Sequence, residues 1–137
     1  MSKAEKIVRG DSGTQKMIGY VIHIFADRVE ARLEIEDKHL NRRGYLHGGI
    51  TALLIDSSCG YASSRSLSED VSQPVVTLNI ETAYLAPGQG KRVTAVARAR
   101  PAGRSIVFCQ AEITSDDGTL IATGNGVFKA VHGHIEK

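Results

Sequence analysis

The amino-acid sequence predicts an α+β fold, in which a curved antiparallel sheet of about six strands wraps around one long central helix. Two observations carry this prediction. Residues 47–65 hold a run that is apolar on nearly every side of a helical axis, which is typical of a helix buried nearly all round. The other apolar runs are short, largely alternate with polar residues, and are separated by turns rich in glycine and proline.

The first part of the chain predicts a polar segment and then a hairpin. Residues 1–16 are polar and charged, and their glycines allow a short helix at most. Residues 20–25 are a continuous apolar run, whereas residues 29–36 alternate between apolar and charged side chains. A strict period of two is typical of a half-buried strand, so the two runs are expected to pair through a turn at Asp27-Arg28.

A loop at residues 37–46 precedes the helix, and a polar loop at residues 66–74 follows it. Four further strands are then expected, at residues 75–85, 92–100, 105–114 and 120–131. At 137 residues the chain is long enough to bury one core without disulfides or metals. We therefore divide it into an N-terminal segment (1–16), one domain (17–131) and a C-terminal tail (132–137).

The composition excludes several classes of function. A formal net charge of +2 is too small to predict nucleic acid binding. The sequence has no apolar run long enough to span a membrane and no signal-peptide pattern, so we expect a cytoplasmic protein without membrane contact. Cys59 and Cys109 lie in apolar surroundings and predict two buried, reduced thiols. His132 and His134 have no third ligand beside them, so no metal site is expected.

One carboxylate, Asp56, interrupts the apolar helix. Burying an ionised carboxylate without a partner costs several kcal/mol, so Asp56 must either serve a site or accept hydrogen bonds from a neighbouring element. The helix is expected to begin at His47-Gly48-Gly49, where unpaired N–H groups and the positive end of the helix dipole favour an anion or a developing oxyanion. Glycine there allows a ligand carbonyl to approach the backbone closely.

The spacing of these two features predicts a dimer if both act on one substrate. Asp56 follows Gly48 by eight residues, which places it roughly 12 Å along the helix axis and about 80° around it. One helix cannot aim both groups at a single carbon atom. A catalytic use of both therefore requires an antiparallel dimer, in which the donor end of one helix meets the acid of another.

The motif residues resemble a known family. Asn41-x-x-Gly44-x-x-His47-Gly48-Gly49, followed by Asp56 and Gly60-Tyr61-Ala62, is similar to the motif of hotdog-fold acyl-CoA thioesterases of the phenylacetic acid degradation (PaaI-like) type. Further similarity is found in Asn79-Ile80-x-x-x-Tyr84-Leu85-x-Pro87, in Gly103-Arg104-Ser105 and in Ala122-x-Gly124-x-Gly126-x-Phe128. The similar region extends from Tyr20 to Phe128, which is nearly the whole chain.

The resemblance implies a hotdog fold and the hydrolysis of an acyl-CoA thioester to a free acid and CoA, without a metal or an organic cofactor. Asp56 would attack the thioester carbonyl or activate water against it, and the Gly48 N–H would stabilise the oxyanion. His47 would orient the loop or polarise the carbonyl, and Asn41 would hold the thioester or the water. The family also implies that Asp56 and Gly48 come from different subunits of a homodimer, and that two dimers commonly form a homotetramer.

Four further residues are expected on the substrate side. Coenzyme A carries phosphates, so a basic rim is expected, and Arg104 with Ser105 is the contact that the resemblance favours. Gly49 is expected to contact the substrate as part of the glycine pair. Some relatives carry Ser or Thr near the acid on the following strand, where this chain has two valines, which leaves Thr77 as the nearest hydroxyl.

The sequence leaves other interpretations of the same residues open. Asp56 could be a structural acid, His47 a packed loop residue, Asn41 a turn or capping residue and Arg104 a solvated charge. A hotdog hydratase or dehydratase would need an acid–base pair, and we find no second partner for Asp56. A non-catalytic acyl-CoA-binding protein would bind without hydrolysis. The sequence does not choose between aryl-acetyl, hydroxybenzoyl and medium-chain acyl groups.

Overall fold

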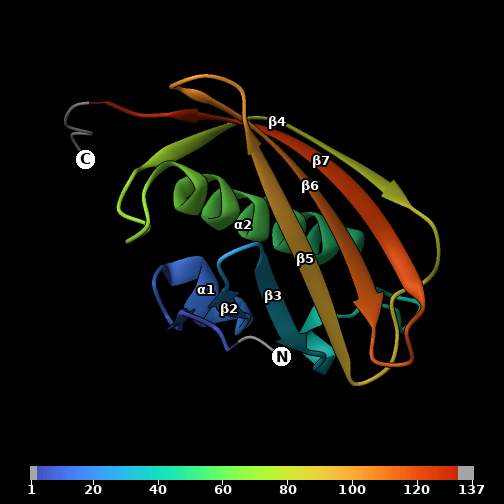
Figure 1. The fold of residues 1–137 in the computed structure, drawn as a ribbon. Helices are drawn as coiled ribbons and strands as arrows, with labels where there is room; N and C mark the ends of the chain where they lie inside the picture. Colours follow the sequence, from blue (N-terminus) through green and yellow to red (C-terminus); the bar gives the residue numbers. More distant parts are fainter. Residues whose placement is uncertain (1–2, 133–137) are drawn as a thin grey trace.

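The long helix α2 (Gly48–Leu67) lies against one face of a curved antiparallel sheet (Figure 1). The computed structural model describes residues 3–132, and within this range the sheet has seven strands in the order β1-β2-β3-β5-β6-β7-β4. Its strands are β1 (Lys6–Val8), β2 (Val21–Ile24), β3 (Val29–Glu34), β4 (Val75–Tyr84), β5 (Arg92–Pro101), β6 (Ile106–Ser115) and β7 (Leu120–Ala130). This is the predicted hotdog architecture, with one long helix packed against a curved antiparallel sheet.

The predicted hairpin and the four later strands are confirmed, with ends that differ by no more than about two residues, the usual uncertainty of such boundaries. After the hairpin β2–β3, the chain passes through the 3₁₀ helix Asp37–His39 and α2. β4 then forms one edge of the sheet beside β7, while β5 pairs with β3. Residues 133–137 of the predicted tail, with His134, lie outside the described residues.

The strand β1 was not predicted, because its stability comes from contacts that a local pattern does not reveal. The buried side-chain amide of Gln15 donates hydrogen bonds to the carbonyl oxygens of Val8 and Tyr20, at 2.8 and 3.0 Å. Gln15 belongs to the short helix α1 (Gly13–Ile18), which Ser12 caps and Gly19 ends with a φ of 92°. The N-terminal segment is thus tied to the edge of the sheet at β2.

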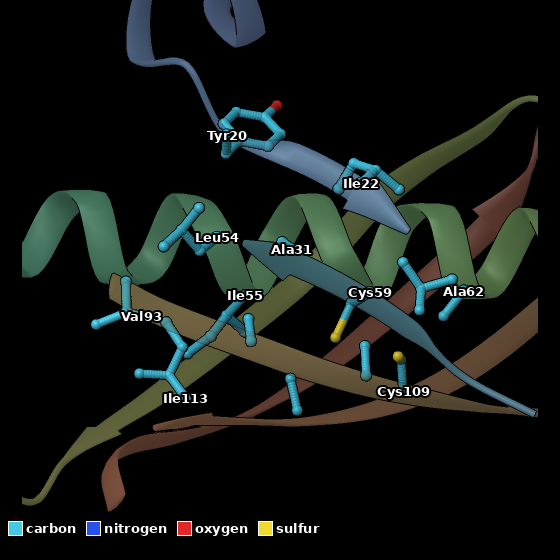
Figure 2. Packing of buried hydrophobic residues seen from close by; sticks show 14 of the residues in the cluster. Tyr20, Ile22, Ala31, Leu54, Ile55, Cys59, Ala62, Val93, Cys109 and Ile113 are labelled. Carbon is cyan, nitrogen blue, oxygen red and sulfur yellow. The ribbon is translucent and has the colours of Figure 1, made fainter. Parts of the chain in front are cut away.

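The helix α2 is buried on one side, which corrects the prediction that it is buried nearly all round. Figure 2 shows Leu54, Ile55, Cys59 and Ala62 packed against residues of the surrounding strands. Leu54 and Ile55 are fully buried, and each contributes about 1.5–3 kcal/mol of hydrophobic stabilisation. On the other side, Asp56 and its neighbours Ser57, Gly60 and Tyr61 are only half-buried. One sheet covers one side, so the remaining side is free to line a site.

Two glycines of β7 allow close packing, Gly124 against α2 and Gly126 beneath the Phe128 ring of the same strand. A Cβ atom at Gly124 would lie 2.5 Å from Cγ2 of Ile55, and one at Gly126 would lie 2.6 Å from the ring of Phe128. Real Cβ atoms do not make contacts this short, so both positions exclude larger residues unless a neighbour moves. Since Ile55 precedes Asp56, this contact helps to set the depth at which the acid lies.

The edge strand β4 contains a β-bulge that changes which side chains face α2. The pairing with β7 skips Leu78, between Thr77 and Asn79. The apolar residues Val76 and Leu78 of this strand are 42% and 55% exposed, whereas the hydroxyl of Thr77 bonds Asp56 of α2. The bulge therefore leaves an exposed apolar edge and turns a hydroxyl toward the helix.

Cys59 of α2 and Cys109 of β6 are both free and buried, as predicted. Their sulfur atoms point into the same space between helix and sheet (Figure 2). The pKa of Cys59 is raised because its thiol hydrogen-bonds with Cys109 and because it is buried, so it stays protonated. Along residues 3–132, no helix is both long and apolar enough to cross a membrane.

Candidate active site

Asp56 lies near the middle of α2, at a hollow of about 400 Å³ that we call the acid-side hollow. This hollow is lined by Asp11, Asp56, Ser57, Gly60, Tyr61, Ser64, Val71, Gln73, Pro74, Val75, Thr77 and Phe128. The hydroxyl of Thr77 donates a hydrogen bond to Oδ1 of Asp56 at 2.8 Å. The carboxylate is therefore partnered and half-exposed, and its second oxygen is available to a reactant.

The wall of the acid-side hollow is held by two further hydroxyl contacts. Tyr61 donates a hydrogen bond to Oδ2 of Asp11 at 2.6 Å, and Ser57 donates one to the Tyr20 hydroxyl at 3.0 Å. Burial and the Asp11 carboxylate raise the pKa of Tyr61, so its phenol stays neutral. The N-terminal segment thus supplies one wall of the hollow, which the sequence did not indicate.

The start of α2 lies at a second hollow of about 550 Å³, which we call the donor-side hollow. It is lined by Asn41, Arg43, Tyr45, Leu46, Gly48, Thr51, Tyr84, Leu85, Ala86, Pro87, Gly88 and Ile121. Two of its lining segments are joined by a hydrogen bond, which the N–H of Leu46 donates to the Gly88 carbonyl at 2.8 Å. A Cβ atom at Gly88 would lie only 2.7 Å from Cβ of Leu46.

The first amides of α2 are occupied with one exception. His47 is the N-cap, and its Nδ1 accepts the N–H of Gly49 at 2.9 Å. Its carbonyl oxygen accepts the N–H groups of Ile50 and Thr51, at 2.9 and 3.2 Å. The N–H of Gly48 has no acceptor among residues 3–132. Gly48 therefore carries the free donor at the positive end of the helix, as a bound oxyanion would require.

The side chains of His47 and Asn41, two predicted site residues, accept hydrogen bonds from nearby backbone N–H groups, which fix their positions. The Nδ1 atom of His47 accepts a backbone N–H, so its neutral ring carries the proton on Nε2. Oδ1 of Asn41 accepts the N–H groups of Arg43 and Tyr45, at 2.9 and 3.2 Å, in a turn that Gly44 completes with a φ of 84°. Asn41 also lines the donor-side hollow, so turn formation and ligand contact are compatible.

The donor half also contains a residue to which the sequence assigned no role. Tyr84, the last residue of β4, donates its hydroxyl to the carbonyl oxygen of Gly48 at 2.7 Å. It is 36 positions away in the sequence, and a tyrosine at a strand end gives no local signal of such a contact. Only its place in the motif that includes Asn79 and Pro87 marked it.

Three other residues predicted on the substrate side, Gly49, Arg104 and Ser105, line neither hollow. Arg104 and Ser105 lie at the turn between β5 and β6, and neither lines the acid-side or the donor-side hollow. Arg104 is exposed, and the Ser105 carbonyl accepts the N–H of Ala130 at 2.7 Å. No group of three potential metal ligands occurs among the residues described.

Asp56 and Gly48 line different hollows, as the helix geometry predicted. β4 runs beside both, because Thr77 near its start bonds Asp56 and Tyr84 at its end bonds Gly48. The strand is thus antiparallel to α2. A single chain offers a carboxylate in one hollow and a free backbone N–H at the other.

Known proteins with similar sequences and structures are thioester hydrolases. The thioesterase superfamily model matches residues 43–122. Acyl-coenzyme A thioesterase 13 of Homo sapiens is 26% identical over 114 residues, which cover 80% of this chain and 79% of that protein. The 1,4-dihydroxy-2-naphthoyl-CoA hydrolase of Listeria monocytogenes is 29% identical over 110 residues, covering 80% and 88%. The crystal structure of a Haemophilus influenzae thioesterase aligns with a TM-score of 0.80 at 27% identity, covering 91% of this chain and 89% of that one.

Proposed function

We propose, from the premise that this chain belongs to the thioesterase superfamily and is a thioester hydrolase, that it cleaves acyl-CoA in a site shared by two copies of the chain. The observation that carries this proposal is the separation of Asp56 from the free Gly48 amide beside an unpaired apolar edge strand. The products are the free acid and CoA. The reaction as proposed needs no metal or organic cofactor.

The geometry of β4 supports the shared site. As an edge strand, β4 presents unpaired backbone groups, and exposed Val76 and Leu78 add apolar surface. If β4 pairs with its copy antiparallel about a two-fold axis, the Thr77 end of one strand lies beside the Tyr84 end of the other. Because Asp56 accompanies Thr77 and Gly48 accompanies Tyr84, Asp56 of one copy then approaches the Gly48 amide of the other.

In this site Asp56 acts on the thioester carbonyl carbon, either by direct attack or by removing a proton from the attacking water. Thr77 holds one carboxylate oxygen and leaves the other for the reaction. The Gly48 N–H of the second copy donates to the carbonyl oxygen as it becomes an oxyanion. The carbon–sulfur bond then breaks, and the CoA sulfur leaves as a thiolate that takes up a proton. If water attacks, its oxygen stays on the released acid. If Asp56 attacks, a mixed anhydride forms, and water then hydrolyses it to the free acid and the Asp56 carboxylate.

The substrate is proposed to be an acyl-CoA, because the relatives in Homo sapiens and Listeria monocytogenes are named for CoA thioesters. The acyl group would enter the acid-side hollow, whose apolar wall includes Val71, Val75 and Phe128. Asn41 and Gly49 would contact the thioester from the donor side. Arg104 and Ser105 lie outside the two hollows, so they would contact the phosphates of CoA at the protein surface.

A mixed dimer tests the shared site. Asp56→Asn removes the acid, and Gly48→Pro removes only the donor, because proline is tolerated at the first helical position. His47 already has a φ of −61° and a ψ of 133°, which suit a residue before proline. Each variant alone should lose about 100-fold or more in kcat, measured by thiol release from a panel of acyl-CoAs.

Co-expression of the two variants with different affinity tags, followed by tandem purification, yields dimers that have one intact site out of two. We expect such dimers to recover about half of the wild-type kcat per dimer. Gly48→Ala is the matched control, since it keeps the N–H and its Cβ would lie 3.4 Å from the Tyr84 ring, so it should lose less than about tenfold. Mixed dimers as inactive as either variant would contradict a shared site, and a fully active Asp56→Asn enzyme would contradict the role of the acid.

A further inference from the structure

Tyr84 is the residue that joins the end of β4 to the start of α2. Its hydroxyl donates to the Gly48 carbonyl at 2.7 Å, and its ring would lie 3.4 Å from a Cβ atom at Gly48. The side chain therefore covers the glycine and bonds its carbonyl at the same time. Tyr84 is 55% exposed in the single chain and lines the donor-side hollow.

The bond to Tyr84 completes a set of contacts that hold two successive peptide groups. The Gly48–Gly49 peptide is bonded at its oxygen by Tyr84, in addition to the intrahelical bond of α2, and at its N–H by Nδ1 of His47. The preceding peptide, whose N–H belongs to Gly48, is held at its oxygen by Ile50 and Thr51. Within residues 3–132, each N–H and carbonyl group of these two peptides therefore has a hydrogen-bond partner, except the Gly48 N–H.

This restraint matters because both residues are glycines. Glycine has access to more backbone conformations than any other residue, so a Gly-Gly pair at the start of a helix can rotate its peptides at small cost. The backbone bonds of Gly48 join the two peptides, so rotation about these bonds would change the direction of the free N–H relative to the Gly48–Gly49 peptide. An oxyanion donor is effective only if it already points at the oxygen before the charge develops.

We propose that Tyr84 is a positioning residue, which locks the Gly48–Gly49 peptide through its hydroxyl and so holds the Gly48 N–H in place for the oxyanion. The inference rests on the proposed function, in which that N–H is the oxyanion donor. Tyr84 acts through the backbone rather than on the substrate. Its loss should therefore lower kcat and leave KM unchanged, because the restraint acts where charge develops in the transition state.

Tyr84→Phe tests the hydroxyl and retains the ring that covers Gly48. We expect kcat for acyl-CoA hydrolysis to fall about tenfold, KM to stay within about twofold and the melting temperature to be retained. The matched control is Ser66→Ala, which removes another hydroxyl that donates to a carbonyl of α2, that of Ser63 at 2.7 Å, away from both hollows. Ser66→Ala should keep the wild-type kcat.

A second variant separates a role of the hydrogen bond from a role in folding. Ring-fluorinated tyrosine at position 84 keeps the shape of the side chain, but its phenol loses its proton at lower pH and can then no longer donate to the Gly48 carbonyl. We expect its kcat to fall with rising pH while the wild-type kcat does not, and KM to stay constant. A pH profile identical to that of the wild type would overturn the proposal, even if Tyr84→Phe failed to fold.

The remaining outcomes also discriminate. A wild-type kcat in Tyr84→Phe, or a raised KM with an unchanged kcat, would overturn the positioning role, the latter because it indicates direct substrate binding. Asp56→Asn is assayed on the same acyl-CoA panel. If wild type is inactive on every substrate, or if Asp56→Asn is as active as wild type, the proposed function fails rather than the role of Tyr84. If both behave as expected and Tyr84→Phe does not, only the inference about Tyr84 fails.

Discussion

The two halves of α2 that contribute to the site are built by different means. In the acid half, the proposed catalytic group is a side chain, Asp56, and another side chain, Thr77, donates a hydrogen bond to it. In the donor half, the proposed catalytic group is the backbone amide of Gly48, and the cap His47 and the hydroxyl of Tyr84 hold the peptide that follows it. Substitutions therefore act directly in the acid half, whereas in the donor half they act mainly by freeing the backbone.

The largest effect should come from preventing the two halves from meeting. Leu78→Glu places a carboxylate on the exposed edge of β4, where two copies would bring like charges together at a cost of several kcal/mol. We expect the dimer to dissociate and kcat to fall by about 100-fold at low protein concentration, as measured by light scattering and thiol release. Met17→Glu is the matched control, because Met17 is 65% exposed on α1 and its variant should stay dimeric and active. A monomeric but fully active Leu78→Glu enzyme would show that one chain suffices.

Loss of the Thr77 hydroxyl should have a smaller effect on kcat, and the mixed dimer should show whether Thr77 supports the acid half or the donor half. Thr77→Val keeps the shape of the side chain but removes the hydroxyl that bonds Asp56, and we expect kcat to fall about tenfold. In the mixed dimer of Asp56→Asn and Gly48→Pro chains, the change should matter only in the Gly48→Pro chain, which supplies the working acid. An equal loss from either chain would mean that Thr77 serves both halves.

The smallest effect on activity should come from the contact beneath the acid half. Gly124→Ala would place a Cβ atom 2.5 Å from Cγ2 of Ile55, so we expect the free energy of unfolding to decrease by about 1–3 kcal/mol. Gly13→Ala is a suitable control, because no atom lies within 4 Å of the added methyl group. Thermal unfolding measures both. Unchanged stability in Gly124→Ala would mean that α2 can move away from β7 without cost.

Much of the fold could be predicted because its signals are local. Alternation at a period of two located the hairpin and the later strands. Asp56 was noticed because it is a carboxylate within an otherwise apolar helix. The bulge at Leu78 could not be predicted, because a shift of one residue changes the face of every side chain without changing the composition of the strand. The strand β1 was missed for a related reason, since it depends on side-chain bonds from Gln15.

Candidate site residues could be named from the sequence where a residue type was itself the signal. Gly48 and Asp56 were marked by their chemistry and stay candidates, and their separation, which the structure shows, followed from helix geometry. The bonds that occupy Asn41 and His47 could not be foreseen, because turn and capping bonds depend on backbone conformation. Arg104 was expected near the substrate, but the turn that carries it lies outside both hollows, so its contact with CoA stays a prediction.

The glycine contacts at positions 88 and 124 impose different rules on how related sequences can vary. At position 124 the main obstacle is the Ile55 side chain, whose Cγ2 would lie 2.5 Å from the added Cβ, and the Glu81 carbonyl oxygen would lie 3.2 Å away. A smaller residue at position 55 removes the main obstacle, so relatives can exchange glycine for alanine at position 124 by a paired change at position 55. At position 88 the obstacle is Cβ of Leu46, which every residue except glycine has. No exchange of one side chain for another at position 46 makes room, so position 88 should stay glycine wherever this loop geometry is kept, while positions 55 and 124 should covary.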